Sequence, residues 1–479
     1  MSALFGRGQQ TLSITVDGDA DLLLVLRVDG AERLSRLPQY TVDVVAKHSM
    51  VTGSESVDLH GMLGKQAHIT FDLPGGKRHI DGHVIRAQRG ERHGRYDRFQ
   101  LVVLPWLWFA TRSRNSRVFQ SQSVTDIIAA VLDPYSSNYE WRLMNQAGLP
   151  TLEYCVQYDE SDFDFVCRLL EEHGIYYFFE HNMTNHTLVM IDGMSLHTAR
   201  DSGTPVVWSN KFDGDHCMTE WRTTEEARAA KAVVRDYDYL ASASEIEGRH
   251  TGRATGSLLG EGEIYQFPAR VVLNQTVETS ASASAAANAA AKRLVEAAQS
   301  MQKLHTGLCN AHDMVCGTTF TLSKAPRSSE NGDYLIVGCD FRAEFGDHEA
   351  IADLKAIKRR RDGFEGQILA LDMRRGVFRP ERTTPRPRMY GPQVATVVGA
   401  QGNEIETDSL GRIKVQFPWD RDGEKDENSS CWVRVAQPWA GSKMGLWMLP
   451  RVGHEVVVSF IGGDPDRPLV TGSVHNDAN

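Results

Sequence analysis

The sequence has 479 residues and a mass of 53.4 kDa, which is long enough for about three domains. Apolar residues make up 41% and charged residues 24%, which excludes an intrinsically disordered chain. The formal net charge of −10 disfavours non-specific binding to nucleic acid or to an anionic membrane. The longest apolar stretch, residues 101–110, is shorter than the about 20 residues that cross a bilayer, so we expect no stable membrane anchor.

Two features bear on where the chain folds. The first ten residues lack the apolar segment of a secretory signal peptide. The seven cysteines are scattered and odd in number, whereas a disulfide framework needs dense, paired cysteines. We therefore expect folding in a reducing cytoplasm, and any export by a route other than the general secretory pathway.

The first 110 residues have the pattern of β structure. They contain runs of β-branched and aliphatic residues, bounded by Asp, Gly or Pro, at 22–28, 40–45, 68–73, 79–86 and 99–104. Such runs are typical of strands in a sheet with one buried face.

Two helices with clear start signals follow. Ser123 and Asp126 form a capping-box pattern, in which the serine hydroxyl accepts from the third backbone N–H of the helix. Ser161 and Asp164 repeat this pattern, and Gly174 suits the residue after the helix, where a left-handed conformation is common.

Further elements are expected up to residue 337. The aromatic run at 175–179 predicts a buried strand, and an alanine-rich stretch predicts a third helix over about 283–303. Strands are expected again at 318–322 and 334–337.

A segment rich in proline and arginine, at 379–391, predicts a linker. It divides the chain into an N-terminal region, 1–378, and a C-terminal domain, 392–479. The C-terminal domain contains five short β segments, at 394–398, 412–417, 432–435, 455–460 and 469–474. Five short strands in fewer than a hundred residues predict a small closed barrel such as an OB-fold.

The sequence motifs of common enzymes are incomplete. A nucleophile elbow needs a second glycine where His197 follows Ser195. The pair His454–Glu455 lacks the second histidine of a zincin helix and has the pattern of a strand. The loop that begins at Gly61 lacks the spacing and the hydroxyl of a phosphate loop. We therefore expect no catalytic residues, no cofactor and no enzymatic activity.

Two clusters could hold a metal. The string His305, Cys309, His312 and Cys316 has soft ligands for Zn²⁺, but its interleaved order is unusual, and ordinary strand and turn structure is the favoured interpretation. The acidic loop at 420–427 has oxygen ligands but not the order of an EF-hand, so a solvated hairpin turn is favoured. We expect no bound metal.

Single-stranded nucleic acid is a further alternative for an OB-fold. Tryptophans such as Trp419 and Trp432 could stack on bases, but the nearby charges are mixed rather than basic. We therefore expect no nucleic-acid partner.

Four C-terminal segments form long, ordered motifs. They are GRIKVQFPWD at 411–420, SSCWVRV at 429–435, PRVGHEVVVSF at 450–460 and GDPDRPLVTG at 463–472. These motifs closely resemble the VgrG family, the spike proteins of bacterial type VI secretion systems. Upstream matches at 63–65, 119–120, 153–158 and 172–180 extend the resemblance over nearly the whole chain, most weakly between about residues 190 and 260.

The resemblance implies a mainly β fold with helical insertions (α+β). The N-terminal region is similar to the hub of contractile phage tails, with two β-barrels, and the C-terminal domain is similar to the five-stranded OB-fold of the tail spike. In the family, three chains present six barrels that match a hexameric Hcp tube. Family members then continue into a trimeric β-helix needle. Because this sequence stops at Asn479, we expect either that the needle is absent from this chain or that the sequence is truncated before it.

Structural roles are expected for the residues of these motifs. Gly411 and Gly453 suit turns that need a positive φ, and Asp464 begins a tight turn. Arg434 and Glu455 are expected to pair across strands. The motif residues are Gly411, Arg412, Phe417, Trp419, Asp420, Cys431, Trp432, Arg434, Pro450, Arg451, Gly453, Glu455, Asp464, Pro465, Asp466, Pro468 and Gly472.

The resemblance also implies a function. We expect a structural hub and spike that forms a homotrimer, docks on the Hcp tube, contacts baseplate proteins and carries effectors or adaptors. A PAAR-repeat tip is expected only if a needle follows. The protein would assemble in the cytoplasm and then be secreted into the medium or a target cell. The alternative is the baseplate hub of a phage tail or a related contractile injection system.

Overall fold

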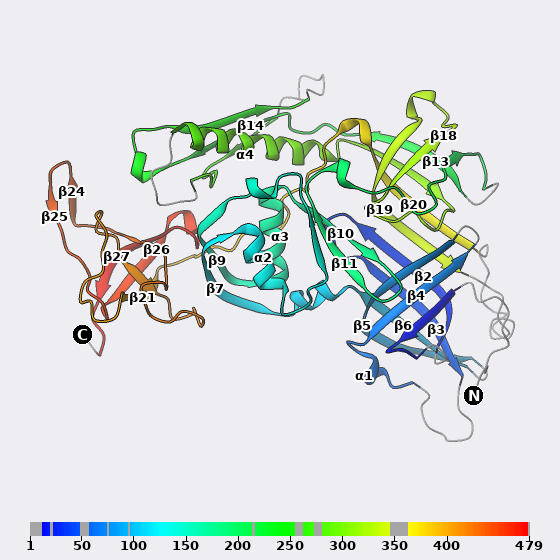
Figure 1. Ribbon diagram of the computed structural model, residues 1–479, viewed down its shortest axis with the longest axis horizontal. Coiled ribbons are helices and arrows are strands. Elements are labelled where there is room, and N and C mark those ends of the chain that lie inside the picture. Colours follow the sequence, from blue (N-terminus) through cyan, green and yellow to red (C-terminus); the bar gives the residue numbers. More distant parts are fainter. Residues whose placement is uncertain are drawn as a thin grey trace.

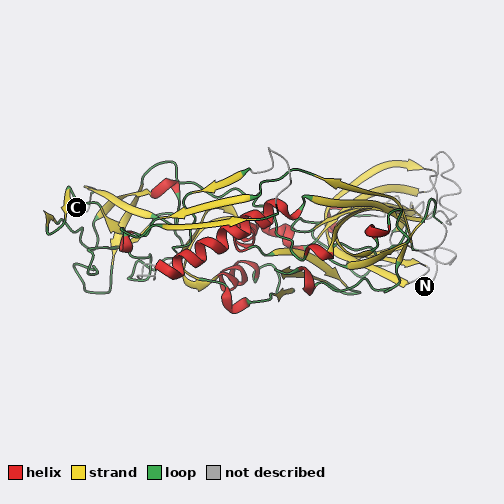
Figure 2. Ribbon diagram, turned by 90° about the horizontal axis from the view of Figure 1, so that it is seen from above, coloured by secondary structure: helices red, strands yellow, loops and turns green. Residues whose placement is uncertain are grey.

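The computed structural model describes residues 12–19, 23–47, 57–73, 76–93, 96–212, 216–253, 262–272, 280–344 and 363–477. The molecule is elongated, with two barrels at one end and a third, small barrel near the C-terminus at the other (Figure 1). A view from above shows helices between these two ends (Figure 2).

The first barrel contains the N-terminal strands. Its strands are β1 (Leu12–Val16), β2 (Leu24–Arg33), β3 (Gln39–Lys47), β4 (Gln66–Leu73), β5 (Gly76–His93) and β6 (Tyr96–Leu104), and the short helix α1 (Leu59–Met62) precedes β4. They pair in the order β1-β4-β5-β6-β3-β2. The expected N-terminal strands are confirmed, except that residue 22 lies outside the described residues.

The second barrel closes on itself. Its strands are β12 (Val206–Trp208), β13 (Cys217–Glu225), β17 (Lys303–Cys309), β18 (Thr319–Ser323), β19 (Gly332–Glu344) and β20 (Gly363–Asp372). They pair in the order β19-β18-β12-β13-β17-β20, and β20 pairs again with β19. Because β19 also pairs with β2, the two barrels share one twelve-stranded sheet.

A buried polar cluster lies where the two barrels meet. Glu32 accepts a hydrogen bond from Arg78 Nη2 at 2.5 Å, from Tyr40 Oη at 3.0 Å and from the backbone N–H of Cys316 at 3.1 Å. Arg78 also donates to the carbonyl of His312 and lies over the Phe341 ring, 4.4 Å from its centroid. One buried ion pair therefore contacts strands of both barrels.

A helical insert separates the strands of the two barrels along the chain. It comprises β7 (Arg114–Ser123), α2 (Val124–Leu132), β8 (Tyr139–Arg142), β9 (Thr151–Ser161), α3 (Asp162–His173), β10 (Tyr176–His181) and β11 (His186–Ile191). Ser123 and Ser161 cap α2 and α3 as expected, accepting from the backbone N–H of Asp126 and Asp164. Gly174 ends α3 with a φ of 72°.

A second insert packs a long helix on a small sheet. Strands β14 (Lys231–Asp236), β15 (Ile246–Thr251) and β16 (Glu263–Gln266) lie against α4 (Ser280–Ser300). A Cβ on Gly248 would lie 2.1 Å from the carbonyl carbon of Ala287, so this approach needs glycine and the small side chains of the alanine-rich run. The predicted end of this helix is wrong, because the chain enters β17 at Lys303 and pairs there with Glu225.

The C-terminal barrel has the five predicted strands. They are β21 (Gln393–Val398), β22 (Lys414–Gln416), β23 (Arg434–Val435), β26 (Glu455–Phe460) and β27 (Pro468–Val474), paired in the order β22-β21-β26-β27-β23. A bridge between Ile413 and Val433 joins the two ends of this order. A hairpin that the sequence pattern did not indicate, β24 (Trp439–Gly441) with β25 (Met444–Leu446), extends from the barrel.

The expected pairing of Arg434 with Glu455 is wrong. Strand β27 lies between β23 and β26, so these side chains are not on neighbouring strands. The Arg434 guanidinium instead lies 4.1 Å from the centroid of the Tyr239 ring, and Glu455 accepts from the side chain of Asn476. Strand order in a barrel is not readable from the spacing of short segments.

Three histidines in the segment from α3 to β12 are held in their neutral form. The pKa of His181 is lowered to about 3, mainly by burial and to a smaller extent by the neighbouring His186 and Arg78. Burial also lowers the pKa of His173 and of His197 to about 4. The ring of His197 is fixed between the carbonyl of Gly317 and the Tyr176 hydroxyl, at 2.7 and 2.9 Å.

We therefore expect the protein to lose stability as the pH falls below about 6.5. Because these pKa values are lower in the folded state, the unfolded chain binds protons first, and the loss grows from pH 6.5 down to about 4. At pH 5 each of these histidines lowers the free energy of unfolding by up to about 2 kcal/mol. Thermal unfolding from pH 8 to 5 measures the effect. Replacing His181 by glutamine should make the stability depend less steeply on pH. An unchanged dependence would contradict the proposed role of His181.

Candidate functional site: the junction of the C-terminal barrel

The motif turn between β26 and β27 faces the rest of the chain. Asp464 accepts from the backbone N–H of Asp466 through its carboxylate at 3.2 Å, and from that of Arg467 through its carbonyl at 2.9 Å. The tight turn expected at Asp464, Pro465 and Asp466 is thus confirmed. It places two carboxylates at the surface where the C-terminal barrel meets the two inserts.

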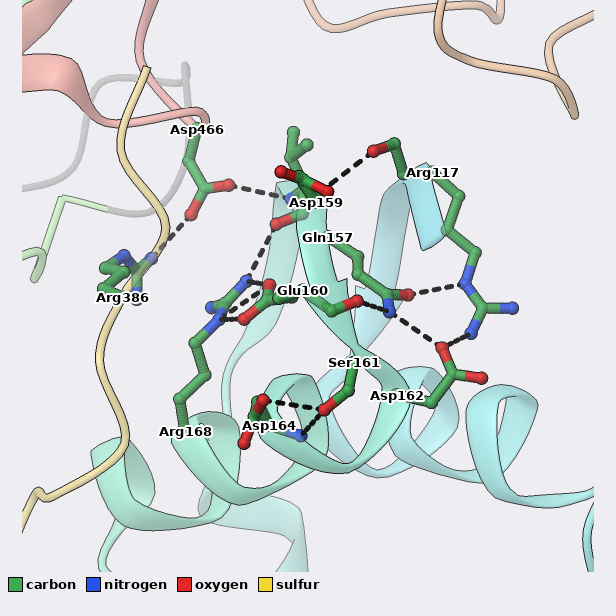
Figure 3. A network of polar contacts seen from close by, with 12 residues as sticks. Arg117, Gln157, Asp159, Glu160, Ser161, Asp162, Asp164, Arg168, Arg386 and Asp466 are labelled. Atoms are coloured by element: carbon green, nitrogen blue, oxygen red, sulfur yellow. Dashed lines mark hydrogen bonds and ion pairs between the residues drawn. The ribbon is translucent and has the colours of Figure 1, made fainter. Parts of the chain in front are cut away.

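Asp466 is the centre of this junction. One carboxylate oxygen accepts from the backbone N–H of Val156 in β9 at 2.8 Å. The other accepts from Arg386 at 2.7 Å and from Arg270 at 3.3 Å. Figure 3 shows Asp466 between Arg386 and strand β9, beside the buried pair of Arg168 and Glu160. One side chain therefore links the C-terminal barrel to three other segments.

Arg386 extends the contact to α3. It forms an ion pair with Glu172, as well as the one with Asp466. Burial opposes the charge of Arg386, but Glu172 and Asp466 outweigh it and raise the pKa of the guanidinium. Both carboxylates therefore hold this arginine charged in a half-buried position.

The proline- and arginine-rich segment lies along α3. Glu171 accepts from the backbone N–H of Thr384 at 3.0 Å, and Arg379 donates to the carbonyls of Gly174 and Asp192. These contacts hold a segment whose composition is typical of a linker. The division of the chain at 379 and 391 stays a prediction.

The second insert supplies the other side of the junction. Arg467 pairs with Asp236 at 2.9 Å, and Arg270 pairs with Asp464. Arg412 donates to the Tyr239 hydroxyl at 2.7 Å, and Arg434 covers the ring of the same tyrosine. Arg467, Arg412 and Arg434 of the barrel motifs therefore contact the second insert.

The acidic loop after β22 is only partly solvated. Asp420 is 9% exposed, and its burial raises the pKa of its carboxyl. The Gln416 side chain donates to the carbonyl of Asp420 at 3.0 Å. Farther along, Arg421 donates to Asn115 at 2.8 Å, and Gln120 donates to the carbonyl of Asn428. The prediction of a solvated hairpin is therefore wrong for the start of the loop, which contacts β7.

The other motif residues are structural parts of the barrel. Phe417 and Trp419 stack with ring centroids 4.9 Å apart, and Cys431 is buried in the core. Gly411 has a φ of 68°, and a Cβ there would lie 2.3 Å from the Trp447 ring. The remaining motif residues also lie within the barrel. Trp432 is covered by Lys414, Arg451 pairs with Glu404, and Gly453 has a φ of 90°. Pro450 precedes β26, and Pro468 and Gly472 lie in β27.

The possible zinc ligands are separated by their other contacts. His305 stacks on Trp221 with centroids 5.2 Å apart, and the Cys309 sulfur accepts from the backbone N–H of Ala311. The backbone carbonyl of His312 accepts a hydrogen bond from Arg78, and the backbone N–H of Cys316 donates one to Glu32. Among the described residues, no three metal-ligating side chains gather at one point.

In the part of the chain that the structure describes, no helix is both long and apolar enough to cross a membrane.

Sequence reasoning missed half of this junction. The motif residues Asp464 and Asp466 were identified, but their partner Arg270 lies far away along the chain. The same is true of Asp236 and Glu172, which pair with Arg467 and Arg386. The available signal was the cluster of arginines in the predicted linker, because such charges need partners when the segment is held against a domain.

Comparison with known families agrees with this architecture. Residues 31–347 match the phage tail baseplate hub (GPD) family, and residues 393–475 match the type VI secretion system/phage-baseplate injector OB domain. Among solved structures, the fold is similar to that of the E. coli c3393 protein, described as a component of the type VI secretion system, with a TM-score of 0.65 and 18% identity over 96% of this chain and 99% of that one. A Francisella PdpA–VgrG complex also shares the fold, with a TM-score of 0.60 and 8% identity over 98% of this chain and 71% of that one.

Similarity in sequence is higher. The chain is 35% identical over 476 residues to the type VI secretion system spike protein VgrG1b of Pseudomonas aeruginosa, covering 98% of this chain and 61% of that protein. It is also 35% identical to VgrG1a of the same organism, covering 95% of this chain and 68% of that protein. The chain thus spans about two thirds of the length of these relatives. With both of its regions matched in order, the chain belongs to the VgrG family of type VI secretion system spike proteins.

Proposed function

We propose that this chain forms a homotrimeric hub that docks on the hexameric Hcp tube. The shared sheet of the two barrels is the observation that carries this proposal, because it fixes two barrels side by side in each chain. Three chains then present six barrels, which matches the sixfold symmetry of a tube ring. Sheath contraction supplies the force, and the junction around Asp466 transmits it to the C-terminal barrel.

Light scattering over a series of concentrations tests the trimer. We expect the mass to rise towards three chains as the concentration increases, because oligomers dissociate on dilution. Addition of hexameric Hcp should then produce a complex of one trimer and one hexamer. A stable dimer, or a monomer that stays monomeric with Hcp at high concentration, contradicts the proposal.

We further propose that the chain itself catalyses no hydrolysis. Its motif residues serve turns, barrel core and ion pairs, and its relatives are spike proteins. Assays on peptidoglycan, phospholipid and nucleic acid should show no turnover above that of heat-treated protein. Turnover that survives purification and disappears with a single carboxylate substitution would overturn this.

The remaining roles belong to the assembled system. We propose assembly in the cytoplasm, contacts with baseplate proteins and effectors or adaptors, and release with the spike into the medium or a target cell. Deletion of the chain should abolish release of Hcp from cells. The phage-tail alternative predicts instead that Hcp release is unaffected.

A further inference from the structure

A cavity of about 540 Å³ lies beside the junction, between the two inserts and the C-terminal barrel. Its apolar lining includes Tyr154 of β9, Tyr239 and Phe267 of the second insert, and Trp432 before β23. The volume lies in the range of sites that bind small molecules or short peptide segments.

The cavity is positively charged in an acidic protein. Seven arginines and four carboxylates line it, whereas the chain as a whole carries a net charge of −10. Three of these arginines pair with Asp464, Asp466 or Asp236. The other four, Arg293, Arg382, Arg388 and Arg434, form no ion pair with a carboxylate among the described residues.

Two buried hydrogen-bond donors of the lining lack acceptors. Neither Arg293 Nε nor the Tyr154 hydroxyl has a hydrogen-bond partner within the described part of the chain, although both atoms are buried. Burial and the nearby Arg382 and Arg379 lower the pKa of Arg293 to about 10. The carboxylates of the protein therefore stabilise the charge of this guanidinium only weakly. Buried donors are rarely left unpaired, so both atoms are available to the acceptor atoms of a ligand.

We propose that this cavity binds an acidic peptide segment of a partner protein. Guanidinium groups bind carboxylates through paired hydrogen bonds, and clusters of arginine recognise acidic motifs. The aromatic walls favour a peptide over an inorganic oxyanion, because a peptide also supplies apolar side chains that pack on Phe267, which is 59% exposed. This site lies within one chain, so it depends neither on trimer formation nor on docking to a tube.

Fluorescence anisotropy of labelled pentapeptides on the full chain tests the proposal. The probes alternate aspartate or glutamate with leucine, phenylalanine or tryptophan, and their matched controls carry asparagine or glutamine instead. We expect the best acidic peptide to bind at least tenfold more tightly than its neutral counterpart, with an affinity that falls as salt increases. Equal affinities, or no binding at millimolar peptide, would overturn the proposal.

Variants locate the bound peptide. Arg293→Met and Arg388→Gln should each weaken binding of the acidic peptide about tenfold, whereas Arg222→Gln, which removes an exposed arginine of β13, should leave it unchanged. Arg388 is exposed and unpaired among the described residues, so its variant decides the question if Arg293→Met fails to fold. Tripolyphosphate that binds more tightly than every peptide would show that the cavity takes an inorganic polyanion, and would contradict a peptide ligand.

Discussion

Replacing Glu32 by glutamine is expected to lower the free energy of unfolding by about 3–5 kcal/mol, because the change leaves the Arg78 charge buried without its partner. Both side chains are about 5% exposed, and the pair contacts strands of both barrels. Burial opposes the charge of Arg78, whereas Glu32 favours it and raises its pKa. Because a guanidinium group in a protein is effectively always protonated, the arginine stays charged after the substitution. Thermal and urea unfolding, followed by circular dichroism, measure the loss.

An exposed ion pair of the same barrel provides the control. Asp72 and Lys77 lie 3.1 Å apart with side chains that are more than half exposed, so Asp72→Asn should cost less than about 1 kcal/mol. Replacing both buried partners, as Glu32→Leu with Arg78→Met, should restore part of the stability that the single change loses. A Glu32→Gln protein as stable as Asp72→Asn would show that the buried pair does not stabilise the joined barrels.

Substitution of Asp466 by asparagine is expected to loosen the C-terminal barrel from the inserts without unfolding it. The change keeps an acceptor for the backbone N–H of Val156 but removes the charge that Arg386 and Arg270 share. All three side chains are less than a quarter exposed, so the loss should be about 2 kcal/mol, or about thirtyfold in the opening equilibrium. Faster amide exchange at Val156 and faster tryptic cleavage after Arg388 report the opening.

Two further variants test whether this effect is specific to the junction. Glu404→Gln breaks an exposed ion pair with Arg451 within the same barrel and should leave exchange at Val156 unchanged. Arg386→Gln should also weaken the junction. Because the two residues are in contact, the double variant with Asp466→Asn should lose less free energy of opening than the two single variants together. Strictly additive effects would mean that Asp466 and Arg386 act at independent contacts.

The sequence alone determined the local elements. Short-range signals are sufficient for these, since the serine caps at Ser123 and Ser161 and the glycine after α3 act within one turn of the helix. The five strands of the C-terminal barrel also follow from apolar patterns a few residues long, and the glycines at 411 and 453 from the backbone that their turns require. The family resemblance then supplied the two barrels, which no local pattern specifies.

Only the tertiary structure decided which elements meet. The pairing of β2 with β19 joins the barrels, and the contact of Val156 with Asp466 spans 310 residues of the chain. The apolar pattern of a strand shows which face is buried but not which strand lies beside it, which is why Arg434 and Glu455 were wrongly paired. The same applies to charges: a carboxylate in a turn attracts any arginine that the fold brings near, and the fold here brings Arg386 and Arg270.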